Sequence, residues 1–239
     1  MYKRVLLKLS GEALKDEKAM AILNVDEVNQ LAKMMKSLHD KGVQIAVVIG
    51  AGNIWRGKLA EGIGIERVPA DYMGMMGTVM NAIAMSSALK NIGVDSVVFS
   101  ALPEIETISV TYSKEAAIKA MEEGKIAFLA GGTGKPYFTT DTAATMRAIE
   151  TNCEAIFMGK NGVQGVYDKD PIKFNDAKFI PEITYNEILK KKLQIMDLTA
   201  VELIKDKDIE IRIFSMSDPQ NFIKVAMGET LGTVCKKGE

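Results

Sequence analysis

The sequence predicts an α/β protein in which a mainly parallel β-sheet is covered by helices on both faces. Short β-branched or apolar runs alternate with longer amphipathic segments along the chain. Parallel strands need crossover connections of this kind, and helices normally provide them. Glycine-rich or polar segments follow several of the expected strands. Because ligands in parallel sheets bind outside the carboxyl ends of the strands, these segments are the expected site.

The first part of the chain contains the clearest periodic segments. Apolar residues recur at helical spacing after Asn24, and Gly42 is placed to end that helix. A long segment rich in Met, Ala and Gly begins at Asp71 and is expected to be core or a subunit contact. The expected strands are 4–9, 43–50, 95–101 and 125–131, and the expected helices are 24–42, 71–90, 113–123 and 141–151.

The second part continues the alternation after an irregular excursion. Residues 160–171 (KNGVQGVYDKDP) follow an apolar run and carry no clear period. Thr184 with Glu187 three residues later forms a capping box that opens a helix. The remaining expected elements are strands at 155–159, 209–214 and near 233, and helices near 197–207 and 219–228.

Composition limits the classes of function. The 239 residues are 47% hydrophobic and 26% charged, which is ordinary for a soluble protein of one domain or two closely joined lobes. The formal net charge of −1 argues against general attraction to nucleic acid or an anionic membrane. No apolar run suits a membrane span, and the first residues lack a signal-peptide pattern. Cys153 and Cys235 have no C-x-x-C partner, which is typical of reduced thiols in a cytoplasmic protein.

The segment AGGTGKPYFTTDTAAT, residues 130–145, superficially resembles a phosphate-binding P-loop. That motif needs a glycine five positions before its Gly-Lys pair, where this chain has Leu129. It also needs Ser or Thr after the lysine, where this chain has Pro136. Proline supplies neither a hydroxyl for magnesium nor a backbone N–H for phosphate. The segment is therefore not a Walker A loop, although its glycines and threonines still suit an anion.

Other polar residues at strand ends have two interpretations each. Lys8, in an apolar strand, either meets a transferring phosphoryl group or extends its ammonium to solvent. Arg56, in the glycine-rich GAGNIWRG, either binds an anion or belongs to an ordinary turn. Asp71 either caps a helix or accepts hydrogen bonds from a ribose. Tyr167 and Asp170 either contact a nucleotide or lie in a plain β-hairpin.

Six motifs in order and spacing resemble the bacterial-type UMP kinases of the amino acid kinase superfamily. They are KLSGEAL, VIGAGNIWRG, ADYMGMM, GGTGKPYFTTDTAA, KNGVQGVYDKDP and MDLTA. The resemblance covers nearly the whole chain. It implies a three-layer αβα sandwich forming one domain, residues 1–239, with the acceptor nucleotide bound mostly by 1–150 and ATP mostly by 151–239. It further implies a cytoplasmic homohexamer that converts UMP and ATP to UDP and ADP with Mg²⁺, in pyrimidine nucleotide biosynthesis.

The resemblance also assigns roles to residues of this chain. The implied catalytic residues are Lys8, Arg56, Asp141 and Asp197. The implied ATP contacts are Lys8, Leu9, Ser10, Gly11, Gly52, Arg56, Asn161, Tyr167 and Asp170. The implied UMP contacts are Ala51, Asp71, Gly132, Thr133, Gly134, Lys135, Pro136, Tyr137, Phe138 and Thr139. No dedicated protein metal site is implied, because Mg²⁺ would be held mainly by the nucleotide phosphates.

The implied chemistry needs positioning and charge neutralisation rather than a strong base. The acceptor is itself an ionised phosphate, which is consistent with a chain that has one His. We expect Lys8 to stabilise the transferring group, with Arg56, loop N–H groups and Mg²⁺ assisting. Asp197 is expected to orient a lysine or the metal.

Three departures from the family pattern stand out. Ala51 replaces a glycine of the usual GGGN, and Lys135 replaces the Asn of the usual GTGNP. If position 51 needs a positive φ, the alanine costs about 1 kcal/mol. The segment KDEKAMAI, residues 15–22, has no glycine, whereas relatives have a glycine-rich segment linked to GTP regulation there. Catalysis is expected to survive these changes, and GTP activation stays open.

Two rival functions are compatible with part of these motifs. Another superfamily member that phosphorylates a carboxylate or carbamate would share the ATP side but should lack Asp71 together with GTGKPYFTTD. A non-catalytic nucleotide sensor would not need Lys8, Arg56, Asp141 and Asp197 together. A nucleic-acid role has the least support because the net charge is close to zero.

Overall fold

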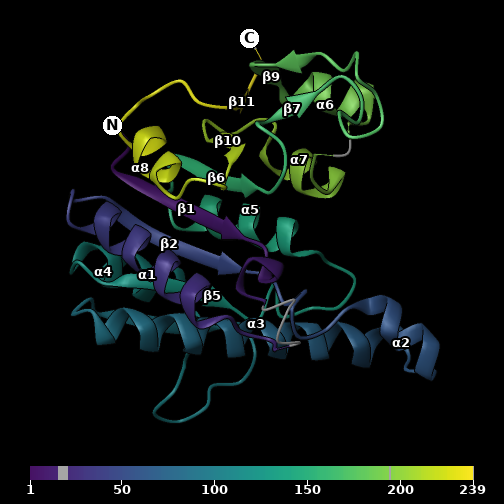
Figure 1. The fold of residues 1–239 in the computed structure, drawn as a ribbon. Helices are drawn as coiled ribbons and strands as arrows, with labels where there is room; N and C mark the ends of the chain where they lie inside the picture. The colour runs from purple at the N-terminus through teal and green to yellow at the C-terminus, as the bar shows by residue number, and fades with distance from the viewer. Residues whose placement is uncertain (16–20, 194, 239) are drawn as a thin grey trace.

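The computed structural model describes residues 1–15, 21–193 and 195–238 (Figure 1). Its main sheet has nine strands in the order β4-β3-β5-β2-β1-β6-β10-β11-β9. The strands are β1 Arg4–Leu9, β2 Gln44–Ile49, β3 Ser96–Ser100, β4 Val110–Thr111, β5 Ile126–Ala130, β6 Ala155–Lys160, β7 Val166–Tyr167, β8 Phe179–Ile180, β9 Glu182–Thr184, β10 Glu210–Ser215 and β11 Thr233–Lys236. Only β10 and β11 pair antiparallel among the described strands of this sheet, so the mainly parallel sheet is confirmed.

Helices connect the strands as parallel crossovers require. They are α1 Val25–His39, α2 Gly57–Ile63, α3 Arg67–Asn91, α4 Lys114–Glu122, α5 Thr140–Glu150, α6 Tyr185–Lys191, α7 Leu198–Ile204 and α8 Gln220–Ala226, with a 3₁₀ turn at Gly11–Leu14. Most begin at a polar cap, as Asn24 does by accepting from two backbone N–H groups. The predicted capping box at Thr184 and Glu187 is present at the start of α6.

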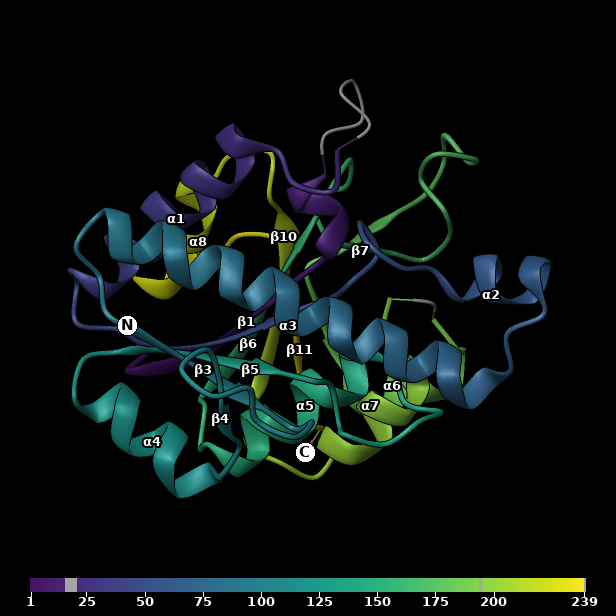
Figure 2. The same cartoon turned by 90° about the horizontal axis from the view of Figure 1, so that it is seen from below.

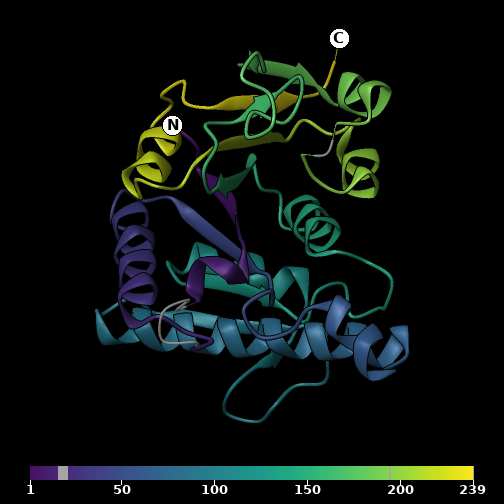
Figure 3. The same ribbon diagram turned by 45° about the vertical axis from the view of Figure 1, so that its right-hand side comes forward.

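Two apolar clusters, one on each face of the sheet, make the three layers. Figure 2 shows α1 and α8 on one side of the strands and α4, α5 and α7 on the other. The same division is visible in Figure 3, where the purple α1 and yellow α8 lie to the left of the sheet. Along β1, Val5, Leu7 and Leu9 enter the cluster beneath α1, α3 and α8. Leu6 enters the cluster beneath α4 to α7, because successive strand side chains point to opposite faces. Lys8 therefore shares the face that α5 covers.

The structure differs from the expectations at short elements and at one helix start. Helix α3 begins at Arg67 rather than Asp71 and includes Pro69 in its first turn, where the missing N–H is tolerated. Asp71 lies inside the helix, so the capping interpretation of Asp71 is wrong. Strands β7 and β8 pair antiparallel, which places Tyr167 in the hairpin considered for that segment. These two-residue strands and α2 carried no periodic signal.

Within the described residues, no helix combines the length and apolar character needed to cross a bilayer.

Candidate functional site

The loops after β1 and β2 contact each other at the carboxyl edge of the sheet. A Cβ at Gly11 would lie 2.3 Å from the carbonyl oxygen of Gly50 and 2.8 Å from the nitrogen of Gly52. Only glycine at position 11 allows this approach, because both opposing atoms belong to the backbone. Thr140 of α5 lies close as well, with its hydroxyl 3.6 Å from a Cβ built on Gly50. The glycine-rich turns thus meet the start of α5 at one edge, as predicted.

Lys8 and Asp141 form an ion pair at this edge. The Lys8 Nζ lies 2.8 Å from Asp141 Oδ1, and each side chain is less than a fifth exposed. Lys8 reaches Asp141 because it lies on the face of β1 that α5 covers. The other carboxylate oxygen of Asp141 accepts from the backbone N–H of Asp197 at 3.1 Å. Three of the four predicted catalytic residues therefore form one cluster, here called the Lys8–Asp141–Asp197 cluster.

Hydroxyl groups hold the Asp197 carboxylate in place. Its Oδ2 accepts from Thr139 at 2.8 Å and from Thr142 at 3.1 Å, while its Oδ1 accepts from the Thr199 N–H at 2.9 Å. Burial raises the pKa of Asp197, but the hydrogen bonds from these threonines outweigh it and leave the pKa below the ordinary value. Asp197 is consequently ionised at neutral pH, and these hydrogen bonds hold its carboxylate in position. Thr139 is also a predicted UMP contact. It therefore links this cluster to residues 131–139, the loop after β5, which we call the acceptor loop.

The oxygen of Asp141 that faces Lys8 is buried and makes no aligned hydrogen bond among the described atoms. The contact with Lys8 is thus mainly a charge interaction, despite its short distance. A buried carboxylate oxygen with spare acceptor capacity suits an ammonium or Mg²⁺. No group of three or more His, Cys, Asp or Glu residues among the described ones is arranged to hold a metal by itself. The cluster fits a Mg²⁺ ion that takes one or two carboxylates and otherwise phosphate and water oxygens.

A cavity of about 300 Å³ lies on one side of the cluster, between α3 and the loop that follows β5. Eight predicted UMP or ATP contacts line it: Ala51, Gly52, Asp71, Gly132, Thr133, Lys135, Phe138 and Thr139. Gly134, Pro136 and Tyr137 are not among its lining residues. Gly52, predicted on the ATP side, thus borders the cavity of the predicted UMP residues. We refer to this space as the acceptor cavity.

Asp71 connects α3 to the acceptor loop by a hydrogen bond. Its carboxylate accepts from the Tyr137 N–H at 2.7 Å and from the Arg67 side chain at 2.9 Å to each oxygen. Tyr137 has φ of 73°, a left-handed conformation that is strained for a residue with a bulky side chain. Arg67 lies over the Tyr137 ring at 5.7 Å. Asp71 therefore helps to hold the loop in addition to facing the cavity.

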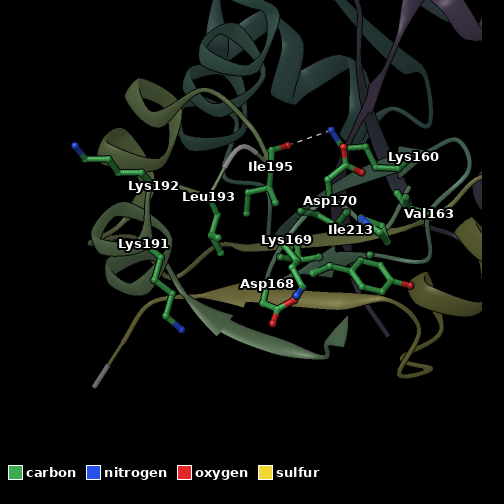
Figure 4. Close-up of a pocket in the computed structure, with 14 residues that line it drawn as sticks. Lys160, Val163, Asp168, Lys169, Asp170, Lys191, Lys192, Leu193, Ile195 and Ile213 are labelled. Atoms are coloured by element: carbon green, nitrogen blue, oxygen red, sulfur yellow. Dashed lines mark hydrogen bonds between the residues drawn. The ribbon is translucent and has the colours of Figure 1, made fainter. Parts of the chain in front are cut away.

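A second cavity, of about 530 Å³, lies beside Lys160 at the end of β6 (Figure 4). It is lined by the β7 hairpin residues and by the segment between α6 and α7, and we call it the donor cavity. Tyr167 and Asp170, both predicted ATP contacts, line it. Tyr167 stacks edge-on against Phe179 at 5.6 Å, which fixes the ring from the hairpin side. The hairpin and nucleotide interpretations of this segment are therefore compatible.

The remaining predicted residues lie near the site without entering the cluster. Arg56 is exposed and pairs with Glu12 at 2.6 Å, and no described contact joins it to Lys8. Ser10 caps the 3₁₀ turn through the Glu12 N–H. Leu9 is buried in the core, so only its backbone could meet a ligand. Asn161 is exposed and does not border the donor cavity.

Comparison with known proteins identifies the family. Residues 3–215 match the amino acid kinase family. The chain belongs to the amino acid kinase family. It is 50% identical over 235 residues to the uridylate kinase of Mycoplasma capricolum, covering 98% of each protein. It is 47% identical to the uridylate kinase of Ruegeria sp. strain TM1040, covering 98% of this chain and 93% of that one. The UMP kinase structure from Bacillus anthracis matches with a TM-score of 0.95 at 34% identity, covering 100% of this chain and 97% of that one.

The structure shows the surroundings of the positions at which this chain departs from the UMP kinase motifs. Ala51 does not adopt a positive φ, so the strain considered for this position does not arise. Its methyl instead faces α3, where a Cβ added at Gly77 would lie only 2.8 Å away. Lys135 is exposed and borders the acceptor cavity. Residues 16–20, in the segment without glycine, lie outside the described residues.

Three residues of this site were missed by sequence reasoning. Trp55 lines the acceptor cavity and donates to the Ala70 carbonyl at 2.8 Å. Asn81, fully buried in α3, donates to the Gly50 carbonyl at 2.8 Å and so holds the glycine-rich turn. A polar amide within the apolar run of residues 79–85 was the available signal for Asn81. Lys160 ends β6 and lines the donor cavity. Its signal was a second lysine at a strand end.

Proposed function

We propose that this chain is a UMP kinase, which transfers the γ-phosphoryl group of ATP to UMP and yields UDP and ADP. The observation that supports this most directly is that the Lys8–Asp141–Asp197 cluster adjoins two cavities. Thr139 hydrogen-bonds Asp197 and borders the acceptor cavity. Ile195 borders the donor cavity and lies two residues before Asp197. UMP in the acceptor cavity and ATP in the donor cavity would place their phosphates at the cluster.

The proposed reaction is an in-line displacement between two phosphates. A phosphate oxygen of UMP attacks the γ-phosphorus, and the bond from that phosphorus to the β–γ bridging oxygen breaks. The ammonium of Lys8 stabilises the negative charge spread over the transferring group. Asp141 holds that ammonium at 2.8 Å, and Asp197 holds Asp141 through its backbone N–H. No residue has to remove a proton, since the attacking phosphate is already ionised near neutral pH.

Mg²⁺ is proposed as the required cation. When bound, it neutralises the donor phosphates and helps to align them. The carboxylates of Asp141 and Asp197 would hold it, together with nucleotide oxygens. Asp141 Oδ1, which faces Lys8 and makes no hydrogen bond among the described atoms, has the acceptor capacity that such a cation needs.

We further propose a cytoplasmic homohexamer with α3 as one subunit contact. Four exposed apolar side chains recur every fourth residue along this helix, which makes one continuous stripe: Val68, Tyr72, Met76 and Met80. A contiguous exposed apolar stripe is typical of a protein contact. The two cysteines are free and buried, as is usual in a reducing compartment. Size-exclusion chromatography with light scattering of Met76→Glu should give a smaller assembly than the unmodified chain, and an unchanged mass would exclude α3 as a contact.

The decisive experiment measures ADP release from MgATP with UMP, CMP and dTMP offered separately. We expect turnover largely confined to UMP in the unmodified chain. Replacing Lys8 by Ala should lower kcat by about 100-fold or more, in line with the loss of one charge-stabilising donor. The exposed Lys3→Ala serves as the matched control, because its side chain lies outside the cluster. UMP binding without any turnover would instead support a nucleotide sensor, and hydroxylamine trapping of an acyl phosphate would support a carboxylate kinase.

A further inference from the structure

Lys160 lies beside Lys8 because of the register of two neighbouring parallel strands. Lys8 on β1 is opposite Met158 on β6. Met158 and Ile156 pack on the same sheet face as Leu6, so this is the face that also carries Lys8. Since side chains alternate along a strand, Lys160 is the next residue of β6 on that face. The sheet thus directs two lysines from adjacent strands toward the start of α5.

The ammonium of Lys160 has no acidic partner within the part of the chain that the structure describes. It is partly buried and donates to the Ile195 carbonyl oxygen at 3.1 Å, as the dashed line in Figure 4 shows. Among residues 1–15, 21–193 and 195–238 it forms no ion pair, whereas Asp141 is already engaged by Lys8 at 2.8 Å. Burial, with the charge of Lys8 second, lowers the pKa of Lys160, and Asp141 offsets this only in part. A partly buried cation with one neutral acceptor is costly unless an anion completes its surroundings.

The position of Lys160 indicates the kind of anion that its ammonium would bind. Lys160 borders the donor cavity together with Tyr167 and Asp170, and it is not among the residues that line the acceptor cavity. The charges of Lys8 and Asp141 both act on its ammonium, so Lys160 lies on the part of the donor cavity lining that adjoins the cluster. A nucleotide whose base lies by the hairpin would direct its phosphates to this side. Negative charge of a polyphosphate, rather than of a sugar or base, is what the ammonium can bind.

We propose that Lys160 is a second catalytic lysine, which binds the β-phosphate of the donor nucleotide and neutralises the charge that remains on ADP. This inference rests on the proposed kinase function. As the bond between the γ-phosphorus and the β–γ bridging oxygen breaks, its electron pair stays on that oxygen. Lys160 stabilises this developing charge, while Lys8 stabilises the transferring group. The two lysines thus act on the two sides of the bond that breaks.

Nucleotide binding to Lys160→Met tests the proposal independently of turnover. Titration calorimetry would compare the β,γ-imido analogue of ATP, ADP, AMP and UMP. We expect the dissociation constants of the analogue and of ADP to rise roughly 10-fold or more, as for a lost charged hydrogen bond. AMP and UMP should bind within about twofold of the unmodified chain, because neither places a phosphate against Lys160. Lys178→Met is the matched control, since it removes the same charge from an exposed lysine directly before β8 that is not among the residues lining the donor cavity.

Kinetics and pH give the signatures that a structural role would not produce. Lys160→Met should lower kcat by about 100-fold, and Lys160→Arg should restore part of it because the charge returns. Affinity for the ATP analogue should weaken as pH rises through the lowered pKa of Lys160, and Lys160→Arg should abolish this dependence. The proposal is overturned if Lys160→Met binds the analogue and turns over normally. It is equally overturned if all four ligands weaken together with a lower Tm, which would show a structural role.

The same data separate this inference from the proposed function. If the unmodified chain fails to phosphorylate UMP, the kinase proposal fails. A selective loss of analogue and ADP binding in Lys160→Met would still support the phosphate contact of Lys160. If UMP turnover is normal and Lys160→Met has no effect, the kinase proposal stands and the catalytic role of Lys160 is excluded.

Discussion

The contact between Ala51 and Gly77 makes a quantitative prediction about the departure from the family motif. An added Cβ at Gly77 would lie 2.8 Å from the Ala51 Cβ, closer than two methyl groups can approach. Two effects of Gly77→Ala on stability oppose each other. Alanine inside a helix is favoured over glycine by about 1 kcal/mol, whereas the clash destabilises the fold. Overpacking in a closed contact costs about 1–3 kcal/mol. Gly77→Ala should therefore lower the free energy of unfolding by up to about 2 kcal/mol.

The destabilising effect of Gly77→Ala should disappear or change sign when Ala51 is replaced by Gly. The clash then disappears, and the nearest side-chain atoms to the new Cβ are those of Ile54 at 3.6 Å, an ordinary contact. In the Ala51→Gly background, Gly77→Ala should be neutral or stabilising by up to about 1 kcal/mol. The coupling energy between the two positions is therefore about 1–3 kcal/mol.

Urea unfolding of the four proteins, followed by circular dichroism at one protein concentration, measures this coupling. Holding the concentration constant removes differences due to assembly. The KM for UMP should rise in Gly77→Ala alone, because Ala51 borders the acceptor cavity and would be pushed toward it. A coupling energy below about 0.5 kcal/mol, the additivity expected of independent sites, would refute the packing argument.

Three further predictions concern single residues. Thr145→Val should raise the free energy of unfolding by about 1 kcal/mol in urea titration, because the buried Thr145 hydroxyl has no hydrogen-bond partner among the described residues; a loss of stability would show that the hydroxyl is satisfied. Asp71→Asn should raise the KM for UMP by roughly 10-fold or more in initial-rate assays, with the KM for ATP within about twofold, since a charged acceptor is lost; equal changes in both would argue against the acceptor role. The lowered pKa of Asp197 makes its carboxylate stabilising above the ordinary value of 3.8, and this contribution is lost as pH falls through the folded-state pKa. Acid unfolding of Asp197→Asn should accordingly show a smaller stability loss between pH 7 and pH 3 than the unmodified chain, and identical pH profiles would contradict the assignment.

Much of the architecture could be predicted because the relevant signals are local. The apolar run of β1 and the helical spacing after Asn24 depend on neighbouring residues only, and both elements lie where they were expected. The short strands β4, β7 and β8 could not be predicted in this way. A two-residue strand has no period of its own and exists through pairing with a distant segment.

The candidate site was predictable to a similar extent. Lys8 and Asp141 were both singled out, and the resemblance to UMP kinases supplied their roles. The residues alone left Lys8 between a catalytic and a solvent-exposed interpretation. The ion pair between Lys8 and Asp141 at 2.8 Å supports the catalytic interpretation. This pair forms because α5 packs on the face of β1 that carries Lys8. Lys160 escaped notice because its importance depends on its neighbour rather than on its own surroundings in the chain.

The sequence by itself determined the alternation of strands and helices, the glycine-rich turns at the strand ends and the family. Tertiary structure alone decided that Lys160 joins Lys8 and that the methyl of Ala51 meets Gly77. The physical reason is that the face to which a side chain points follows from its position within one strand. Which strand or helix lies beside that face depends on how the entire chain buries its apolar residues, and no local pattern contains that information.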